Sequence, residues 1–189
     1  MGQGERVIVY FTADHHFGHA NVIQHCDWPF ASAHEMDETL IDNWNESVKQ
    51  HDTVYILGDL FFRNKVPADV MLKRLNGKKY LIIGNHDKDW MKRTDLPSFF
   101  ESVSNMVETS DGAHKLTLCY YPFMTWGGAS RGSYMIYGHI HNNTNAAFFP
   151  LICSMPNLLN AGVDINGCRP VSFAELVDNN ARFKEAYGS

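Results

Sequence analysis

The sequence predicts an α/β fold in which two packed mixed β-sheets are flanked by helices. Between residues 6 and 83, apolar segments of strand length alternate with helical patterns, which is typical of parallel strands joined by helical crossovers. After Asp87 the pattern changes to strand segments around an Asp-Gly turn at Asp111, which indicates antiparallel or mixed pairing. The two patterns together predict two sheets of different strand order.

The first predicted strand covers residues 6–12 and is apolar on both faces, as a central parallel strand is. A capping box from Ser32 to Glu35 then predicts the start of a helix. Apolar residues recur at every fourth position of this helix and form one face that covers the sheet. They are Met36, Leu40, Trp44 and Val48.

The rest of the first half continues the alternation. A second strand is predicted over residues 54–57, and residues 67–75 form a short helix with a proline near its first turn. Asn76-Gly77 ends that helix, and a third strand over 80–83 follows directly. The resulting order, β-α-β-α-β, predicts a parallel sheet.

The second half predicts a hairpin, two further strands and a final helix. The hairpin joins 106–109 to 114–119, and the strands lie at 134–137 and 159–163. Ser172 to Glu175 forms a second capping box, which starts a short surface helix at the end of the chain. The segment from Asn142 to Pro156 has the least pattern and is expected to be a surface loop.

Length and composition predict one domain over residues 1–189, with no separate capping domain. The chain is 44% hydrophobic and 20% charged, as globular proteins are, and its net charge of -5 argues against stable binding of duplex nucleic acid. The four cysteines show no short paired spacing, and no apolar segment reaches the length of a signal or a membrane helix. A cytoplasmic protein without a membrane partner is expected.

Four of the predicted strands end in polar side chains that can bind ions. The first leads into Asp14 and His16, and the second leads into Asp59. The third leads into Asn85 and His86, and the strand at 134–137 leads into His139 and His141. Ligands of open α/β sheets gather at the carboxyl ends of strands, so these side chains are expected to form one site.

The residue types favour a metal site. Asp14 and His16 lie two positions apart, and His139 and His141 repeat that spacing, so each pair can point to one side of an extended segment. With Asp59 the set offers imidazole and carboxylate ligands, which suit manganese, with iron, zinc or nickel as alternatives. Two ions that share a carboxylate use such a set fully, and paired ions about 3.5–4 Å apart promote in-line attack on phosphorus.

These motifs resemble those of the calcineurin-like metallophosphoesterases, in particular a small bacterial and phage branch. The motifs are Asp14-x-His16, Gly58-Asp59, Gly84-Asn85-His86-Asp87 and Gly138-His139-x-His141, in this order. The resemblance implies a four-layer α/β/β/α sandwich. It also implies a dinuclear phosphoesterase that hydrolyses a phosphomonoester or a small phosphodiester, such as a nucleotide, by attack of a metal-bridging hydroxide.

The resemblance also implies a role for each matching residue. Asp14, His16 and His141 would hold the first ion. Asp59 would bridge the two ions, Asn85 and His139 would hold the second ion, and Asn85 would also contact the substrate. His86 would be the general acid.

Four positions need separate treatment. Tyr120 stands where the family usually has a further histidine ligand, so it is either a ligand of the second ion or an ordinary strand residue. Phe62 stands where the protein-phosphatase branch has an aspartate that pairs with the catalytic histidine. Arg63 matches the arginine of that branch that binds phosphate, and a guanidinium can bind two phosphate oxygens. His19 is expected to lie close to the ligands, on the substrate side.

Two other functions remain open at this point. The first is a nuclease or a cyclic-nucleotide phosphodiesterase. The second is a catalytically weakened scaffold of the same fold, which the exchange of histidine for Tyr120 favours.

Overall fold

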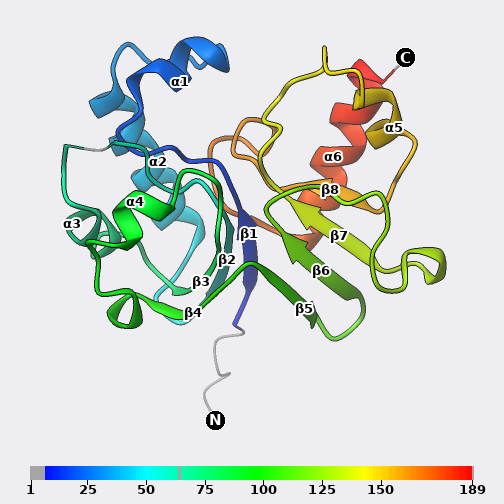
Figure 1. The fold of residues 1–189 in the computed structure, drawn as a ribbon, viewed down its shortest axis with the longest axis horizontal. Coiled ribbons are helices and arrows are strands. Elements are labelled where there is room, and N and C mark those ends of the chain that lie inside the picture. The colour runs from blue at the N-terminus through cyan, green and yellow to red at the C-terminus, as the bar shows by residue number, and fades with distance from the viewer. Residues whose placement is uncertain (1–6, 64, 189) are drawn as a thin grey trace.

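A computed structural model describes residues 7–63 and 65–188 of the chain. The described residues form two β-sheets with helices beside them (Figure 1). One sheet has the strand order β4-β3-β2-β1-β9 and the other has the order β5-β6-β7-β8. Each sheet mixes parallel and antiparallel pairs, so the predicted fold class is confirmed.

The first sheet is parallel except at one edge. Its strands are β1 (Val9–Thr12), β2 (Thr53–Leu57), β3 (Lys78–Ile82), β4 (Phe100–Ser104) and β9 (Val171–Ser172). β1 to β4 pair in parallel, whereas β9 is antiparallel to β1. The predicted β-α-β-α-β order is therefore confirmed, and β4 and β9 were not predicted.

The second sheet contains the predicted hairpin. Its strands are β5 (Met106–Ser110), β6 (Lys115–Cys119), β7 (Tyr134–Tyr137) and β8 (Leu158–Asn160). β5 and β6 are antiparallel, and β6, β7 and β8 pair in parallel. In each sheet, the strands that lead into predicted site residues run parallel to one another. Their carboxyl ends therefore lie at the same edge of that sheet, and the predicted site residues lie there too.

Four helices lie beside the first sheet (Figure 1). They are α1 (Ala20–His25), α2 (Ala33–Ser47), α3 (Ala68–Leu72) and α4 (Lys88–Met91). The predicted apolar face of α2 is buried, and it packs in one core cluster with residues of β1, β2 and β3. The Ser32 side chain accepts a hydrogen bond from the Glu35 amide, but Glu35 accepts one from Ala31 rather than from Ser32, so the predicted capping box forms only in part.

Two helices accompany the second sheet, and both correct the sequence analysis. The predicted loop 142–156 contains α5 (Phe149–Cys153), whose Phe149 and Ile152 are buried. The final helix, α6 (Phe173–Tyr187), has 15 residues and is not short, and its Leu176 is fully buried. Its capping box, from Ser172 to Glu175, is complete. Two short 3-10 helices, Leu96–Ser98 and Ala129–Arg131, complete the described elements.

The apolar core between the sheets fixes their relative position. Phe11, Leu57 and Ile82 from the first sheet share one cluster with Leu118 and Ile136 from the second. Their neighbours along the strands, such as Ile56 and Leu81, point to the opposite face of the sheet and pack there in the cluster that contains α2, because side chains alternate in a strand. In the described part of the chain, no helix has the length and apolar character needed to cross a membrane.

Candidate metal centre

The predicted site residues follow the carboxyl ends of four strands. Asp14 follows β1, Asp59 follows β2, and Asn85 and His86 follow β3. The turn after β7 carries His139 and His141. The backbone ties these turns together, because the Asp14 amide donates a hydrogen bond to Gly58 O and the His139 amide donates one to Asp14 Oδ2 at 2.8 Å. The two sheets therefore contribute to one site.

The backbone of the site is strained. Among the described residues, eight that are not glycine have a positive φ, a conformation that residues with a Cβ rarely adopt. Six of these eight are predicted site residues: Asp14, His16, Asp59, Arg63, His139 and His141. Such conformations cost about 1–3 kcal/mol each and tend to cluster at functional sites, because the surrounding structure must hold them.

Glycines allow the turns to approach closely. A Cβ atom at Gly138 would lie 2.7 Å from Leu57 O and 2.9 Å from Asp14 Oδ2. Both distances are too short for a Cβ atom, so only glycine fits at this position. Gly84 is equally confined, since its Cβ would overlap with Asp59. The glycines of the motifs therefore bring the carboxylates of β1 and β2 against the turns that carry His139 and Asn85.

Three predicted ligands converge at one point, which we call the first position. The ligand atoms of Asp14, His16 and His141 all lie within 4.8 Å of one another. The Nε2 atoms of His16 and His141 face each other at 3.2 Å, and Asp14 Oδ1 is buried without a hydrogen-bond partner. An unpaired buried acceptor is unfavourable, so this donor set fits a cation.

The protonation of the two imidazoles supports that fit. Burial and the neighbouring His141 lower the pKa of His16 to about 2. Burial also acts to lower the pKa of His141, but hydrogen bonds to Asp164 and Cys26 raise it to about 11. A proton shared by the two Nε2 atoms therefore places positive charge beside Asp14, and a cation bound there would take the place of that proton.

Asp164, which the sequence analysis did not include, orients His141. Its side chain is fully buried, and its Oδ2 lies 3.0 Å from His141 Nδ1 while its Oδ1 accepts a hydrogen bond from Trp28. Cys26 Sγ lies 3.3 Å from the same His141 nitrogen. A carboxylate that holds the Nδ1 proton leaves Nε2 to bind a cation once Nε2 has lost its own proton, so Asp164 directs His141 Nε2 toward the other candidate ligands.

Asp59, His139 and Tyr120 form a second group, which we call the second position. The Tyr120 hydroxyl donates a short hydrogen bond to Asp59 Oδ2 and lies 3.1 Å from His139 Nδ1. Burial and the carboxylates of Asp14 and Asp59 raise the pKa of Tyr120 well above its usual value. The protonated phenol thus lies between the two residues expected to bind the second ion.

Asp87 supports the second position. It was named as part of a motif in the sequence analysis but was given no role there. Its buried carboxylate accepts hydrogen bonds from the amides of Asp59, Leu60 and Gly84, at 2.9, 3.0 and 2.7 Å. Burial raises the pKa of Asp87 despite these bonds. The carboxylate thereby fixes the turn after β2 against the turn after β3.

His86 and Asn85 lie nearer to solvent. Asn85 is exposed, and the His86 side chain is 39% exposed with its Nε2 at 3.9 Å from Asp59 Oδ2. The His86 amide donates to Asp59 Oδ1, so the bridging candidate also holds the backbone of the candidate acid. Asn85 lines a cavity that His86 also lines, but Asn85 does not line the larger cavity that contains His139.

Phe62 packs among the remaining candidates. Its ring meets the His86 ring edge-on at 4.6 Å and lies 4.0 Å from the His19 ring, and the Arg63 guanidinium lies 5.2 Å from the same ring. Where a relative would have a charged partner for the acid, this chain has an apolar contact. Arg63 itself is exposed.

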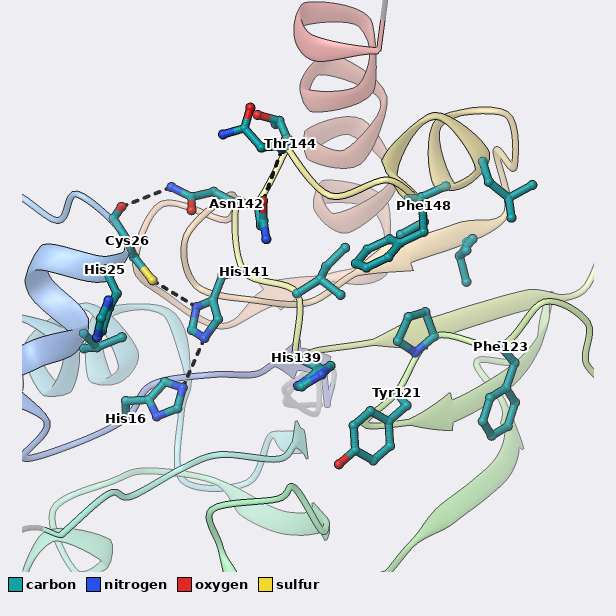
Figure 2. Close-up of a pocket in the computed structure, with 18 of the residues that line it drawn as sticks. His16, His25, Cys26, Tyr121, Phe123, His139, His141, Asn142, Thr144 and Phe148 are labelled. Atoms are coloured by element: carbon teal, nitrogen blue, oxygen red, sulfur yellow. Dashed lines mark hydrogen bonds between the residues drawn. The ribbon is translucent and has the colours of Figure 1, made fainter.

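A cavity of about 1000 Å³ opens over the site. His16 and His141 lie at one end of it and Phe123 and Phe148 at the other, with His139 and Tyr121 in contact between them (Figure 2). His19 and His86 also line it. Fully buried His15 points instead toward the core, where it stacks on Phe17. The cavity is large enough for a small organic molecule next to the candidate ligands.

Comparison with known proteins identifies the family. A sequence profile described as Calcineurin-like phosphoesterase matches residues 8–152. The chain belongs to this family. The protein is therefore a hydrolase of phosphate esters, and its family implies that it uses divalent metal ions. The resemblance predicted from the sequence motifs is confirmed.

Individual relatives agree in sequence and fold. The uncharacterized protein MJ1445 of Methanocaldococcus jannaschii is 34% identical over 171 residues, which cover 89% of both chains. The gene 66 protein of Mycobacterium phage D29 is 29% identical over 71% of this chain and 78% of its own. A crystal structure of the protein of unknown function AQ665 from Aquifex aeolicus shares the fold, with a TM-score of 0.71, 24% identity and coverage of 92% and 99%.

Proposed function

We propose that this protein hydrolyses a phosphomonoester or a small phosphodiester with two divalent metal ions, manganese being favoured. The observation that supports this most directly is the convergence of Asp14, His16 and His141 around an unpaired buried carboxylate oxygen. These three residues would hold one ion, and Asp59, Asn85 and His139 would hold the other, with Asp59 shared. Bound ions of this kind supply Lewis acidity, which activates water and neutralises charge on the phosphate.

In this proposal His86 is the general acid. It lines the cavity beside the ligands, and its ring is exposed enough to reach a bound ester. When water adds to phosphorus and the ester P–O bond breaks, protonated His86 gives its proton to the leaving oxygen. A proton from the attacking water then restores the acid, so no covalent intermediate with the protein is needed.

Arg63 and His19 would bind the phosphate group in the proposed complex. Arg63 follows the turn that carries Asp59, and its guanidinium can donate two parallel hydrogen bonds to phosphate oxygens. His19 lines the cavity, and its imidazole can donate a hydrogen bond there. Both side chains therefore have donors that a substrate can use.

The test compares two esters in the presence of added manganese. We expect His86→Ala to lower kcat by about 10²–10⁴-fold on an alkyl phosphate, whose leaving oxygen needs a proton. The loss on p-nitrophenyl phosphate should be much smaller, because nitrophenolate is a stable leaving group. His34→Ala, which removes an exposed histidine from α2, is the control and should behave as wild type on both esters. Equal losses on the two esters would exclude His86 as the acid.

A further inference from the structure

A second cavity, of about 600 Å³, lies next to His86 and differs in charge from the first. We call it the basic cleft. Phe62, Asn85 and His86 line it together with side chains from α3, α4 and the segments before and after them. Its basic residues are Arg63, Lys65, Lys88 and Arg93.

The positive charge of the basic cleft is not compensated. Its two acidic residues, Asp69 and Asp89, lie 3.9 and 3.8 Å from Lys73 and Lys92, which are not among its lining residues. Within residues 7–63 and 65–188, none of the four basic side chains of the cleft forms an ion pair. In a chain with a net charge of -5, such a local excess of positive charge favours an anionic ligand.

The larger cavity differs from the basic cleft because it has no such excess of charged side chains. None of the described residues that line it is Lys, Arg, Asp or Glu. Beyond the histidines, it presents aromatic side chains such as Tyr121 and Phe148 and the amides of Asn142 and Asn145 (Figure 2). A flat, neutral group with hydrogen-bonding edges fits these walls, because aromatic faces stack on rings and amides both donate and accept.

His86 is the point where the two cavities meet, since it lines both. We propose that the substrate is a short single-stranded oligonucleotide, with an unpaired base in the larger cavity and a neighbouring phosphate in the basic cleft. The inference rests on the proposed function, because the phosphodiester between these two groups would be the one hydrolysed. Oligonucleotides alternate neutral rings with anionic phosphates, which matches the alternation of the two cavities, and only an unpaired base presents its edges to the cavity wall.

The test measures a ratio of kcat/KM values with added manganese. The numerator is hydrolysis of oligothymidylate of five nucleotides, and the denominator is hydrolysis of bis(p-nitrophenyl) phosphate, which carries one negative charge. The variant combines Lys88→Glu with Arg93→Glu, two exposed positions of the cleft. The control is Lys78→Glu, an exposed lysine at the opposite end of β3 from His86.

We expect the double variant to lower this ratio by at least tenfold, while the control keeps the wild-type ratio. Since each neutralised phosphate of a single strand contributes about 0.7 to the slope of log(kcat/KM) against log salt, and the cleft would hold one phosphate, the slope for oligothymidylate should become shallower by about 0.7. Phe148→Ala should lower the same ratio, because it removes an aromatic side chain on which the base would stack. A dinucleotide and a duplex oligonucleotide provide two more substrates, and both should react more slowly than the single strand.

The outcomes separate this inference from the proposed function. If the wild type hydrolyses neither of these two diesters nor p-nitrophenyl phosphate with manganese, the proposed function fails. If it hydrolyses only p-nitrophenyl phosphate, the oligonucleotide inference alone is refuted. If it hydrolyses bis(p-nitrophenyl) phosphate but the double variant keeps the wild-type ratio and salt slope, only the basic cleft is refuted. Equal rates on duplex and single strand would refute the placement of an unpaired base in the larger cavity.

Discussion

The first and second positions of the candidate metal centre use similar residues, but the candidate ligand atoms at the two positions have different hydrogen-bond partners. At the first position, Asp14 Oδ1 has no hydrogen-bond partner, and a buried carboxylate fixes His141. At the second position, Tyr120 already joins Asp59 to His139. A cation at the first position therefore meets a free carboxylate oxygen and has to displace only the proton between His16 and His141, whereas at the second it must displace a phenol that joins two of the ligands.

The energetic consequence follows from the cost of unpaired groups. A buried polar atom without a partner costs about 1–3 kcal/mol, which a bound cation at the first position would remove. At the second position a cation must first displace the hydrogen bonds of Tyr120, so part of its binding energy is lost. Unequal affinity of the two positions is therefore expected, and variants of three residues test it.

The largest effect is expected for Asp59→Asn, because the proposed function shares this carboxylate between the two ions. Amide for carboxylate preserves shape but removes the charge that two ions would share. We expect bound metal to fall at both positions and kcat/KM to fall by more than about 100-fold, which exceeds the range for changes outside the ligand shell. Elemental analysis and steady-state kinetics measure the two quantities.

The control for this variant is Asp42→Asn, which makes the same exchange at an exposed position of α2. It should retain wild-type metal content and activity. If Asp59→Asn still carried two ions per chain, the assignment of Asp59 as the shared ligand would be wrong.

An intermediate and one-sided effect is expected for Asp164→Asn. The amide still accepts a hydrogen bond from His141 but no longer raises the basicity of the ring by its charge. Affinity at the first position should fall by about 10–100-fold, with the second position unaffected. A metal titration resolves this, with Asp178→Asn on the exposed face of α6 as the control. Equal losses at both positions would mean that Asp164 supports the fold and not the first position.

Sequence patterns predicted which candidate ligands lie close together, because the relevant signal is local. A short apolar segment that stops at a polar residue marks a strand end, and the carboxyl ends of parallel strands meet at one edge. Asp14, Asp59 and His139 all carry this signal and lie together in the structure. Asp164 carries it too, directly after the predicted strand 159–163, so its role was available from the same rule.

The parts that sequence missed depend on contacts between distant segments. β4 is an edge strand whose exposed side chains weaken its apolar pattern, and β9 has only two residues. α5 begins with Phe149-Pro150 in a segment without helical periodicity. Burial of Phe149 and Ile152 beside the second sheet stabilises this helix. Likewise, no local pattern states whether the Tyr120 hydroxyl faces Asp59 or solvent.

The smallest effect, and the most informative for the comparison, is expected for Tyr120→His. A histidine would remove the phenolic proton from Asp59 and add a nitrogen ligand beside His139. We expect the second manganese ion to bind about tenfold more tightly, at the lower end of the range for single supporting residues, with the first ion unchanged. Full activity should then require less added metal, which an activity titration measures.

Tyr120→Phe separates the two contributions of this change. It also removes the hydroxyl, so it frees Asp59 Oδ2, but it adds no ligand. The affinity of this variant for an ion at the second position should lie between those of the wild type and the histidine variant.

If Tyr120 instead bound a ferric ion as tyrosinate, the wild type would show a visible charge-transfer band that both variants lack. The raised pKa of Tyr120 argues against tyrosinate, since only a strongly acidic ion displaces such a proton near neutral pH. Identical stoichiometry, affinity and activity in all three proteins would show that the second position does not depend on Tyr120, and the contrast between the two positions would then have to lie in the exposed Asn85.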